Sequence, residues 1–434
     1  MTTDTAVKIM SSEVYKTITA LVQQDIREFY LTDNTPWVVC YSGGKDSTAL
    51  VQLVFASIAS IPPDQRTKNI HVISNNTKVE NPAVLSHMQT QLNHINEYGK
   101  NTLFAHRPEG FSAQLLEPTL KDSFWVNLIG KGYPAPNRWF RWCTERLKIN
   151  PTSAYIQGRL EENQEVIIVL GTRKAESSNR ANSMKMHEQG GRLREHKLPN
   201  AFVYAPIADL SNDDVWAYLL QNPTQWGSDN GDLLELYGKA SGGGECPLVI
   251  ETGTQSCGKS RFGCWVCTVV DRDKSMENFI TNGDAWLNDL LSFRNWLYDI
   301  RQETNQYVPN ALAQRIKFSG LLLRTRIRAF EELMRIQQEN HVQLISPEEQ
   351  TEVERMLHLQ GWGNHETSTK KYIYKLKNGA QAVVFCDFDI LLSGRIRIGN
   401  LSLKGSVLID QIEVAASYNR CTRAMFYVSK GGES

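Results

Sequence analysis

The sequence predicts an α/β protein with a doubly wound, mostly parallel sheet, and two observations lead to this prediction. Short apolar runs alternate with helical periods of apolar residues from residue 11 to residue 219. One of these runs, Trp37–Cys40, is followed at once by the glycine turn Ser-Gly-Gly-Lys-Asp-Ser and then by a helical period. Such alternation is typical of a parallel sheet covered by helices on both faces. Ligands of these sheets bind beyond the carboxyl ends of the strands.

The first elements follow from their periodicity. Residues 11–30 place apolar side chains on one side of a helix, and a second helical period follows the glycine turn over 48–55. The apolar runs 70–73 and 102–105 are predicted to be short strands. Between them, a proline opens a helix over 82–97, because proline is favoured in the first helical turn.

The next elements complete the sheet. A helix is predicted over 149–160, and the run 165–170 is the clearest buried strand of the chain. Residues 177–200 are polar and lack an apolar period, which predicts a surface loop or a mobile lid. A further strand is predicted at 202–205, and Ser211 is placed to cap a helix with acidic residues in its first turn.

The remaining chain differs in composition. Residues 241–270 are rich in glycine and cysteine, helices are predicted at 276–300 and 317–338, and short strands and turns begin at about 370. We therefore expect three parts: an α/β domain that contains the glycine turn, a cysteine-rich segment, and a smaller C-terminal α+β region of unknown role. Their predicted bounds are 1–240, 241–275 and 276–434.

Composition excludes some classes of protein. The 434 residues contain 47 basic and 47 acidic side chains, so any contact with nucleic acid must use local basic patches. The longest apolar runs are far shorter than a membrane span, and the N-terminus lacks a signal-peptide pattern, so a cytoplasmic protein is expected. Eight cysteines in such a chain favour metal binding or chemistry over a disulfide scaffold.

The glycine turn indicates a site for phosphate. A turn between a strand and a helix presents backbone N–H groups and the positive end of the helix dipole to an anion. Gly43 and Gly44 permit close approach of the backbone, Lys45 adds a positive charge, and Ser42 and Ser47 add hydroxyl groups. Asp46 follows the lysine, so the turn is not a Walker A loop. The alternative is an ordinary glycine-rich turn.

A second motif follows the strand at 165–170. Gly171 permits close backbone approach, and Arg173 can contact phosphate oxygens with two N–H groups. Further along, Ser211 precedes the segment Asn-Asp-Asp-Val-Trp-Ala-Tyr-Leu, which by itself indicates only a capped, amphipathic helix.

Four cysteines are spaced as C-x10-C-x6-C-x2-C. Their thiolates suit tetrahedral zinc or an iron–sulfur cluster equally well, and spacing alone leaves zinc, iron–sulfur and no metal open. Cys143 stands apart from them, and Arg141 and Arg146 near it in sequence are expected to lower its pKa and favour the thiolate. The alternative is an inert cysteine packed beside Trp142. The four clustered residues are Cys246, Cys257, Cys264 and Cys267.

Together these motifs resemble known families. Ser-Gly-Gly-Lys-Asp-Ser resembles the PP-loop of ATP pyrophosphatases. With Gly-Thr-Arg-x-x-Glu-Ser and Asp-Asp-Val-Trp-x-Tyr-Leu, it resembles the phosphoadenosine-phosphosulfate (PAPS) reductase branch over about residues 35–225. The resemblance implies a five-stranded parallel sheet, ATP with Mg²⁺ as ligand, phosphate contacts from Ser42 through Ser47, and nucleotide contacts from Gly171 and Arg173. Lys45 and Asp46 are implied to act in catalysis.

The cysteine region is more specific. Gly-Gly-Glu-Cys-Pro-Leu-Val and Ser-Cys-Gly-Lys-Ser-Arg-Phe-Gly-Cys-Trp-Val-Cys resemble DndC-type proteins and their SspD relatives, which are sulfurtransferase components of DNA phosphorothioation systems. That resemblance implies a [4Fe–4S] cluster on the four cysteines, a sulfur-carrying or active-site role for Cys143, and DNA, a cysteine desulfurase and other phosphorothioation subunits as partners. A PAPS or adenylylsulfate reductase, a tRNA thiolase and a non-catalytic ATP-binding iron–sulfur subunit are the alternatives.

Two basic stretches with interleaved aromatic residues are candidates for DNA contact, each with a solvated surface as the alternative. They are Arg138 to Lys148 and Lys370 to Lys377. By contrast, Arg324, Arg326 and Arg328 are predicted to form the polar side of a helix, and Cys40 is predicted to have a core role in its strand.

Overall fold

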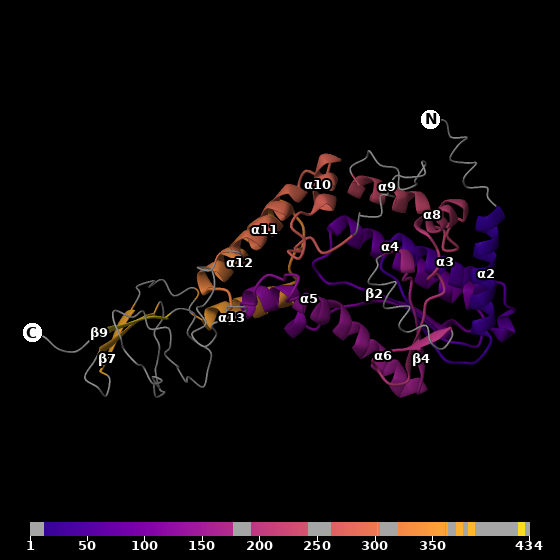
Figure 1. The fold of residues 1–434 in the computed structure, drawn as a ribbon, viewed down its shortest axis with the longest axis horizontal. Coiled ribbons are helices and arrows are strands. Elements are labelled where there is room, and N and C mark those ends of the chain that lie inside the picture. The colour runs from indigo at the N-terminus through magenta and orange to yellow at the C-terminus, as the bar shows by residue number, and fades with distance from the viewer. Residues whose placement is uncertain are drawn as a thin grey trace, which may run out of the picture. The chain divides into compact units, whose positions relative to one another are not determined.

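The computed structural model describes residues 13–176, 192–241, 262–301, 303, 320–360, 362, 370–375, 381–386 and 424–429. The chain divides into two compact units (Figure 1). One comprises the described residues of 1–119 and 141–291, and the other those of 120–140 and 292–434. The units are thus divided differently from the three predicted parts, since residues 120–140 belong with the C-terminal half.

The first unit is built on a six-stranded sheet with the order β3-β2-β1-β4-β6-β5. Five strands are parallel, and β5 pairs with β6 in antiparallel orientation at one edge. The predicted doubly wound, mostly parallel α/β fold is confirmed, with an antiparallel edge strand added to the five parallel strands. The strands are β1 (Trp37–Cys40), β2 (Ile70–Asn75), β3 (Phe111–Leu116), β4 (Val166–Val169), β5 (Leu193–Glu195) and β6 (Ala201–Tyr204).

Helices cover both faces of this sheet (Figure 1). On one face, Trp37 and Val39 of β1 belong to a core that includes the almost completely buried helix α3. On the other face, Val38 packs in a smaller core with Ile156 of α6. The helices of this unit are α2 (Glu13–Tyr30), α3 (Lys45–Ala59), α4 (Pro82–Tyr98), α5 (Trp142–Thr144), α6 (Asn150–Asn163), α8 (Asn212–Gln221), α9 (Asn230–Ser241) and α10 (Lys274–Thr281).

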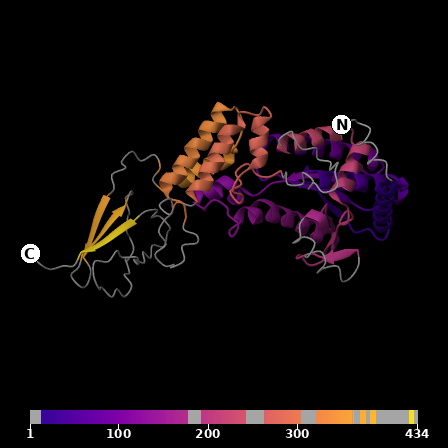
Figure 2. The same cartoon turned by 45° about the horizontal axis from the view of Figure 1, so that its top comes forward.

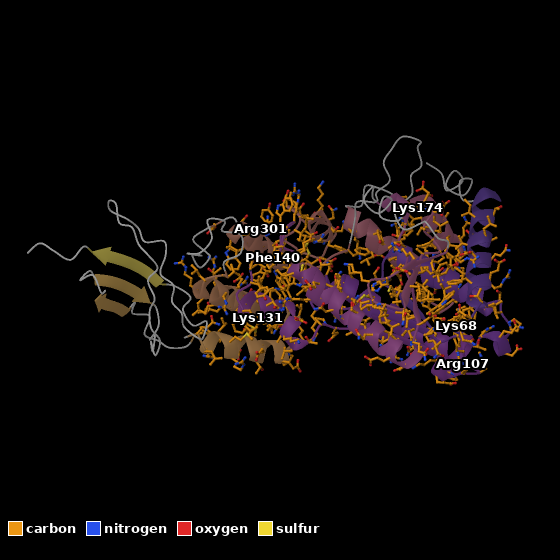
Figure 3. The ribbon with its side chains drawn as sticks, turned by 60° about the horizontal axis from the view of Figure 1, so that its bottom comes forward. Lys68, Arg107, Lys131, Phe140, Lys174 and Arg301 are labelled. Carbon is orange, nitrogen blue, oxygen red and sulfur yellow. The ribbon has the colours of Figure 1, made fainter. Side chains whose placement is uncertain are left out.

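The direction of the parallel strands shows which edge of the sheet carries their carboxyl ends, where ligands bind. Lys68 and Arg107 stand just before β2 and β3, and the Arg107 guanidinium donates to the Lys68 carbonyl oxygen over 3.2 Å. Lys174 stands just after β4. Figure 3 shows this pair and Lys174 at opposite ends of the unit. The glycine turn and Gly171 therefore lie at the same carboxyl edge as Lys174.

The predicted strand at Thr102–Ala105 is wrong. Helix α4 continues into a π-helical turn over Gly99–Leu103, and the third strand is instead β3. Leu103 and Phe104 are buried in this helical extension, so burial made the run apolar without making it extended. The Phe111 ring lies where a Cβ on Gly99 would be, 2.1 Å from that position, which explains why the extension contains a glycine.

Other differences concern boundaries. The predicted helix at 276–300 is broken into α10 and α11 (Leu287–Ile300), with Gly283 at a φ of 116° between them. Within the predicted loop at 177–200, residues 193–195 form the edge strand β5, and residues 177–191 lie outside the described residues. Helices α9 and α13 (Pro347–His358) were not predicted.

The second unit contains α12 (Leu323–Glu339), α13 and the π-helical turn Val126–Gly130. Helices α11 and α12 lie side by side (Figure 2), with the Arg328 guanidinium 4.9 Å from the centre of the Trp296 ring. A three-stranded antiparallel sheet confirms the strands expected near the C-terminus. It consists of β7 (Lys370–Lys375), β8 (Gln381–Cys386) and β9 (Ala424–Ser429).

Candidate nucleotide and sulfur site

The site begins where β1 and β4 end. These strands are neighbours in the sheet, and their connections run to opposite sides, so the carboxyl ends form a topological switch point at which ligands bind. A pocket of about 510 Å³ lies here. Its walls include the predicted residues Ser42, Gly44, Lys45, Asp46, Ser47, Gly171 and Arg173.

The glycine turn has the backbone that phosphate binding requires. Gly43 has a φ of 72°, which side chains rarely allow, and a Cβ there would lie 3.1 Å from Cβ of Met88. Gly44 caps α3 without a side-chain hydrogen bond. The Ser47 hydroxyl accepts the Ser42 N–H over 3.1 Å and donates to the Gly44 carbonyl over 2.9 Å. The Ser47 hydroxyl therefore fixes the shape of the glycine turn, which lies at the positive end of the α3 dipole.

The charged residues of the two motifs meet in this pocket. Asp46 pairs with Lys45 over 2.8 Å through one carboxylate oxygen and accepts the Arg173 Nε–H over 2.6 Å through the other. Lys45 and Arg173 are only 9 % and 3 % exposed, so water screens their charges weakly. Because Lys45 and Arg173 face the single carboxylate of Asp46, the net charge of these three side chains is positive. A Cβ on Gly171 would lie 3.1 Å from the Asp46 carbonyl, so the two turns touch through backbone.

Thr172 was not predicted as a site residue. Its hydroxyl oxygen is buried and, within the described part of the chain, has no hydrogen-bond partner. The residue lines the pocket between Gly171 and Arg173. Because buried hydroxyl groups are nearly always bonded, this one indicates a polar ligand or ordered water in the pocket.

The cysteine turn packs against a residue that lines this pocket. Cys267 donates its N–H to the Cys264 carbonyl over 3.0 Å, which closes a tight turn. Cys264 forms a β-bridge with Glu80, and Glu80 also lines the phosphate pocket. The Thr77 hydroxyl lies 3.3 Å from the Cys264 sulfur and donates to Glu80 over 3.0 Å. Glu80 therefore links the wall of the pocket to the cysteine turn.

Lys148, another pocket residue, carries its ammonium 3.6 Å from the Glu80 carboxylate. Burial acts to lower the pKa of Lys148, but Glu80, Cys264 and Cys143 together raise it above its usual value. The cation is therefore close enough to both cysteines to interact with their charge, and it offsets part of the effect of burial on the pKa of Cys264.

These residues fit part of a metal site. Two cysteines on one tight turn, with a hydroxyl group beside one sulfur, suit an iron–sulfur cluster or zinc. Burial raises the pKa of Cys264, so this thiol ionises only when a metal or cation compensates. No group of three metal-binding side chains occurs among the described residues. The predicted ligands Cys246 and Cys257 lie outside them.

The expectations for Cys143 need correction. Burial raises the pKa of its thiol, followed by the nearby charge of Cys267, and Arg141 lowers that pKa only in part. The cations close in sequence are outweighed because most of the Cys143 side chain is shielded from water, and the charge of Cys267 acts in the same direction. Cys143 is therefore close enough to Cys267 for their charges to interact, although it is far from the four clustered cysteines in sequence. The predicted core role of Cys40 is confirmed, because it packs against the smaller core of the sheet; it also lines the pocket, and burial raises its pKa to about 12.

The basic stretch from Arg138 to Lys148 is only partly exposed. Trp139 is 92 % exposed, whereas Trp142 is 5 % exposed and belongs to the core. Arg326 is 2 % exposed, so the prediction that it lies on the polar side of a helix is wrong. Its guanidinium instead donates to carbonyl oxygens of the π-helical turn Val126–Gly130. The side chains from Lys370 to Lys377 lie outside the description.

The fold and the glycine turn define a class, the α/β proteins that bind the phosphates of a nucleotide at the switch point of a doubly wound sheet. Comparison with family models identifies the family within this class. Residues 36–270 match the phosphoadenosine phosphosulfate reductase domain, and the chain belongs to that family. The match includes the glycine turn, the Arg173 motif and all four clustered cysteines.

Individual relatives are distant. An uncharacterized protein of Methanocaldococcus jannaschii is 25 % identical over 271 residues, which cover 62 % of this chain and 44 % of that protein. The chain therefore spans less than half the length of this relative. PAPS reductase from Candida auris is 12 % identical with a TM-score of 0.29, over 49 % of this chain and 84 % of that one.

A U34-tRNA thiolase from Methanococcus maripaludis, solved with its [4Fe–4S] cluster, is 12 % identical with a TM-score of 0.30, over 69 % of this chain and 86 % of that one. Among the described residues, no helix is long and apolar enough to cross a membrane.

Proposed function

We propose that this protein is the ATP-dependent sulfurtransferase component of a DNA phosphorothioate modification system. The observation that carries the proposal is the position of Glu80 between the pocket and the cysteine turn. Glu80 lines the phosphate pocket and is bridged to Cys264, so ATP and a sulfur-handling turn can act on one acceptor. The cysteine motifs that resemble DndC-type proteins supply the acceptor class, which is the DNA backbone phosphate.

In the proposed first step, ATP activates the phosphate. The N–H groups of the Ser42–Ser47 turn, with Lys45 and Arg173, hold the β- and γ-phosphates. A non-bridging oxygen of the DNA phosphate attacks the α-phosphorus, the bond to pyrophosphate breaks, and an adenylated DNA phosphate forms. Lys45 and Arg173 are cations in a poorly screened pocket, so they stabilise the charge that develops on the leaving pyrophosphate. Mg²⁺ bound to the phosphates would neutralise further charge.

In the second step, sulfur replaces AMP. A cysteine desulfurase supplies the sulfur as a persulfide on Cys143, whose terminal sulfur attacks the DNA phosphorus. The P–O bond to AMP breaks and a P–S bond forms. A second thiol then attacks the Cys143 sulfur, which releases the phosphorothioate and leaves a disulfide for an external thiol to reduce.

Cys264 and Cys267 would hold a [4Fe–4S] cluster together with Cys246 and Cys257. When bound, it would supply electron transfer or hold the cysteine segment in place. Iron and sulfide analysis of anaerobically purified protein tests this part, with four of each expected per chain. A stoichiometric zinc content would rule the cluster out.

The decisive experiment incubates the protein with ATP, DNA, a cysteine desulfurase and its partner subunits. We expect pyrophosphate release and phosphorothioate dinucleotides in the digested DNA, and Cys143→Ser should retain the first and lose the second. Sulfite release from a sulfonucleotide would indicate a reductase, and thiolated bases in tRNA a thiolase. No pyrophosphate release under any condition would indicate a non-catalytic subunit.

The fully exposed Trp139 next to Arg138 supports local DNA contact, because an exposed indole can stack on a base. Binding of DNA should weaken steeply with salt if basic residues contact phosphates. Binding without salt dependence would remove this part of the proposal.

A further inference from the structure

Tyr237 brings a hydroxyl group to the glycine turn from a distant part of the chain. Tyr237 lies in α9, a helix that was not predicted from the sequence and that belongs to none of the motifs. Its side chain lines the pocket at the glycine turn. Its hydroxyl oxygen accepts the backbone N–H of Lys45 over 3.3 Å. Lys45 is the first residue of α3, so this N–H belongs to the start of the helix that faces an anion, and here it is bonded to the tyrosine oxygen.

The hydroxyl group lies directly over the turn. A Cβ on Gly44 would lie 3.2 Å from the Tyr237 oxygen, so any other residue at Gly44 would crowd it. The Lys45 ammonium lies 5.9 Å from the centre of the Tyr237 ring. The Lys45 ammonium and the phenolic hydroxyl therefore lie on the same side of the glycine turn, and the Lys45 N–H holds the hydroxyl oxygen there.

Two aromatic contacts fix the ring. Trp216 of α8 meets it edge to face, with ring centres 5.2 Å apart and planes at 90°. Phe262 packs against it with ring centres 4.5 Å apart. Trp216 belongs to the Asp-Asp-Val-Trp motif of the sequence, and Phe262 stands two residues before Cys264. The ring thus rests on one motif of the nucleotide domain and on the start of the cysteine turn.

We propose that Tyr237 is a further nucleotide-binding residue, whose hydroxyl group donates a hydrogen bond to the β- or γ-phosphate of ATP held at the glycine turn. Trp216 and Phe262 are its positioning residues. The inference rests on the proposed function in one respect, the binding of ATP at this pocket. A phenolic hydroxyl can accept the Lys45 N–H and donate its own hydrogen at the same time, so the contact in the structure and the contact to phosphate are compatible.

The test is Tyr237→Phe, which removes the hydroxyl group and keeps the ring with its Trp216 and Phe262 contacts. Hydrogen bonds to charged groups are the stronger ones, so the dissociation constant for ATP should rise about tenfold, equivalent to about 1.4 kcal/mol. Calorimetric titration of the full-length protein with ATP, AMP and adenosine provides the measurement. Binding of adenosine should be unchanged, because adenosine has no phosphate.

Tyr98→Phe is the matched control, since Tyr98 stacks on Phe55 and its side chain is not part of the pocket wall. Equal affinities of wild type and Tyr237→Phe for ATP would overturn the inference and leave the proposed ATP chemistry standing. A parallel loss for adenosine would reduce Tyr237 to a packing role. If the wild type itself bound no ATP, both the inference and the proposed function would fail.

Discussion

At the scale of single residues, the Asp46 carboxylate holds the two buried cations of the site in place. Its two carboxylate oxygens contact Lys45, the preceding residue, and Arg173, which lies 127 residues further along the chain. Without this carboxylate, two nearly buried cations would face each other in a medium that screens poorly. Asp46 therefore holds both cations at the pocket wall, and their remaining positive charge is available to phosphate.

Arg173→Ala should weaken ATP binding strongly. Loss of a charged donor costs about 1.5–3 kcal/mol, so the KM for ATP in pyrophosphate release should rise roughly ten- to hundredfold. Lys174→Ala is the control, because Lys174 pairs with the exposed Asp209 over 2.8 Å and does not line the pocket. That exposed pair contributes little, so the control should change KM less than twofold. Equal effects of both substitutions would contradict the assignment.

His71 predicts an acid sensitivity of the sheet. Burial lowers its pKa to about 4, with a further contribution from the charge of Arg159. The unfolded chain binds a proton on this residue below about pH 6.5, whereas the folded chain does so only near pH 4. The free energy of unfolding therefore falls as the pH falls from about 6.5 to 4, by about 2 kcal/mol at pH 5.

His71→Gln isolates this contribution, because glutamine can keep the contact with the Ser112 hydroxyl, now 2.8 Å from the ring, and does not titrate. Unfolding of both proteins in urea is compared at pH 7 and pH 5. The wild type should lose about 2 kcal/mol more than the variant between these values. Identical losses would show that His71 is protonated in the folded state.

The elements of the fold differ in how far sequence predicts them. Strands β1, β2, β4 and β6 were predictable because their apolar runs end in turn residues. Thr102–Ala105 was not, because a buried helical extension and a buried strand have the same composition over four residues. The site followed the same rule. The residues around Ser42 and Arg173 are local motifs, whereas Glu80 and Tyr237 reach the pocket only through tertiary structure.

Helix α8 carries a prediction at this level. Ser211 and Asp214 form a capping box, with the Ser211 hydroxyl accepting the Asp214 N–H over 3.1 Å. Ser211→Ala should cost about 1 kcal/mol of stability. Because α8 also carries Trp216, which supports the Tyr237 ring, the affinity for ATP should fall as well.

Ser346→Ala removes the same kind of cap from α13 in the other unit. It should cost a similar stability and leave the affinity for ATP unchanged. Thermal unfolding and ATP titration of both variants decide the matter. If Ser346→Ala also reduced the affinity for ATP, the loss in Ser211→Ala would reflect lower overall stability and not the support of the Tyr237 ring by α8.

At the scale of the whole molecule, every residue that lines the phosphate pocket lies in the first unit. The second unit has its own buried polar centre at Arg326. The guanidinium donates to the carbonyl oxygens of Ile129 and Gly130 and to the Gln360 side chain. Burial lowers the pKa of Arg326 to about 10, so the ion remains charged at neutral pH and keeps its acceptors satisfied.

Arg326→Leu should therefore destabilise the second unit without changing the nucleotide site. Three acceptors would lose their donor, and unsatisfied buried groups cost about 1–3 kcal/mol each, so we expect a loss of about 3 kcal/mol. Arg328→Leu is the control, because Arg328 is exposed and its loss should cost less than about 1 kcal/mol. Hydrogen exchange of the α12 amides should accelerate about a hundredfold or more in the first variant only. Exchange in α3 and the affinity for ATP should stay at wild-type values in both variants, and a weaker affinity in Arg326→Leu would show that the pocket depends on the second unit.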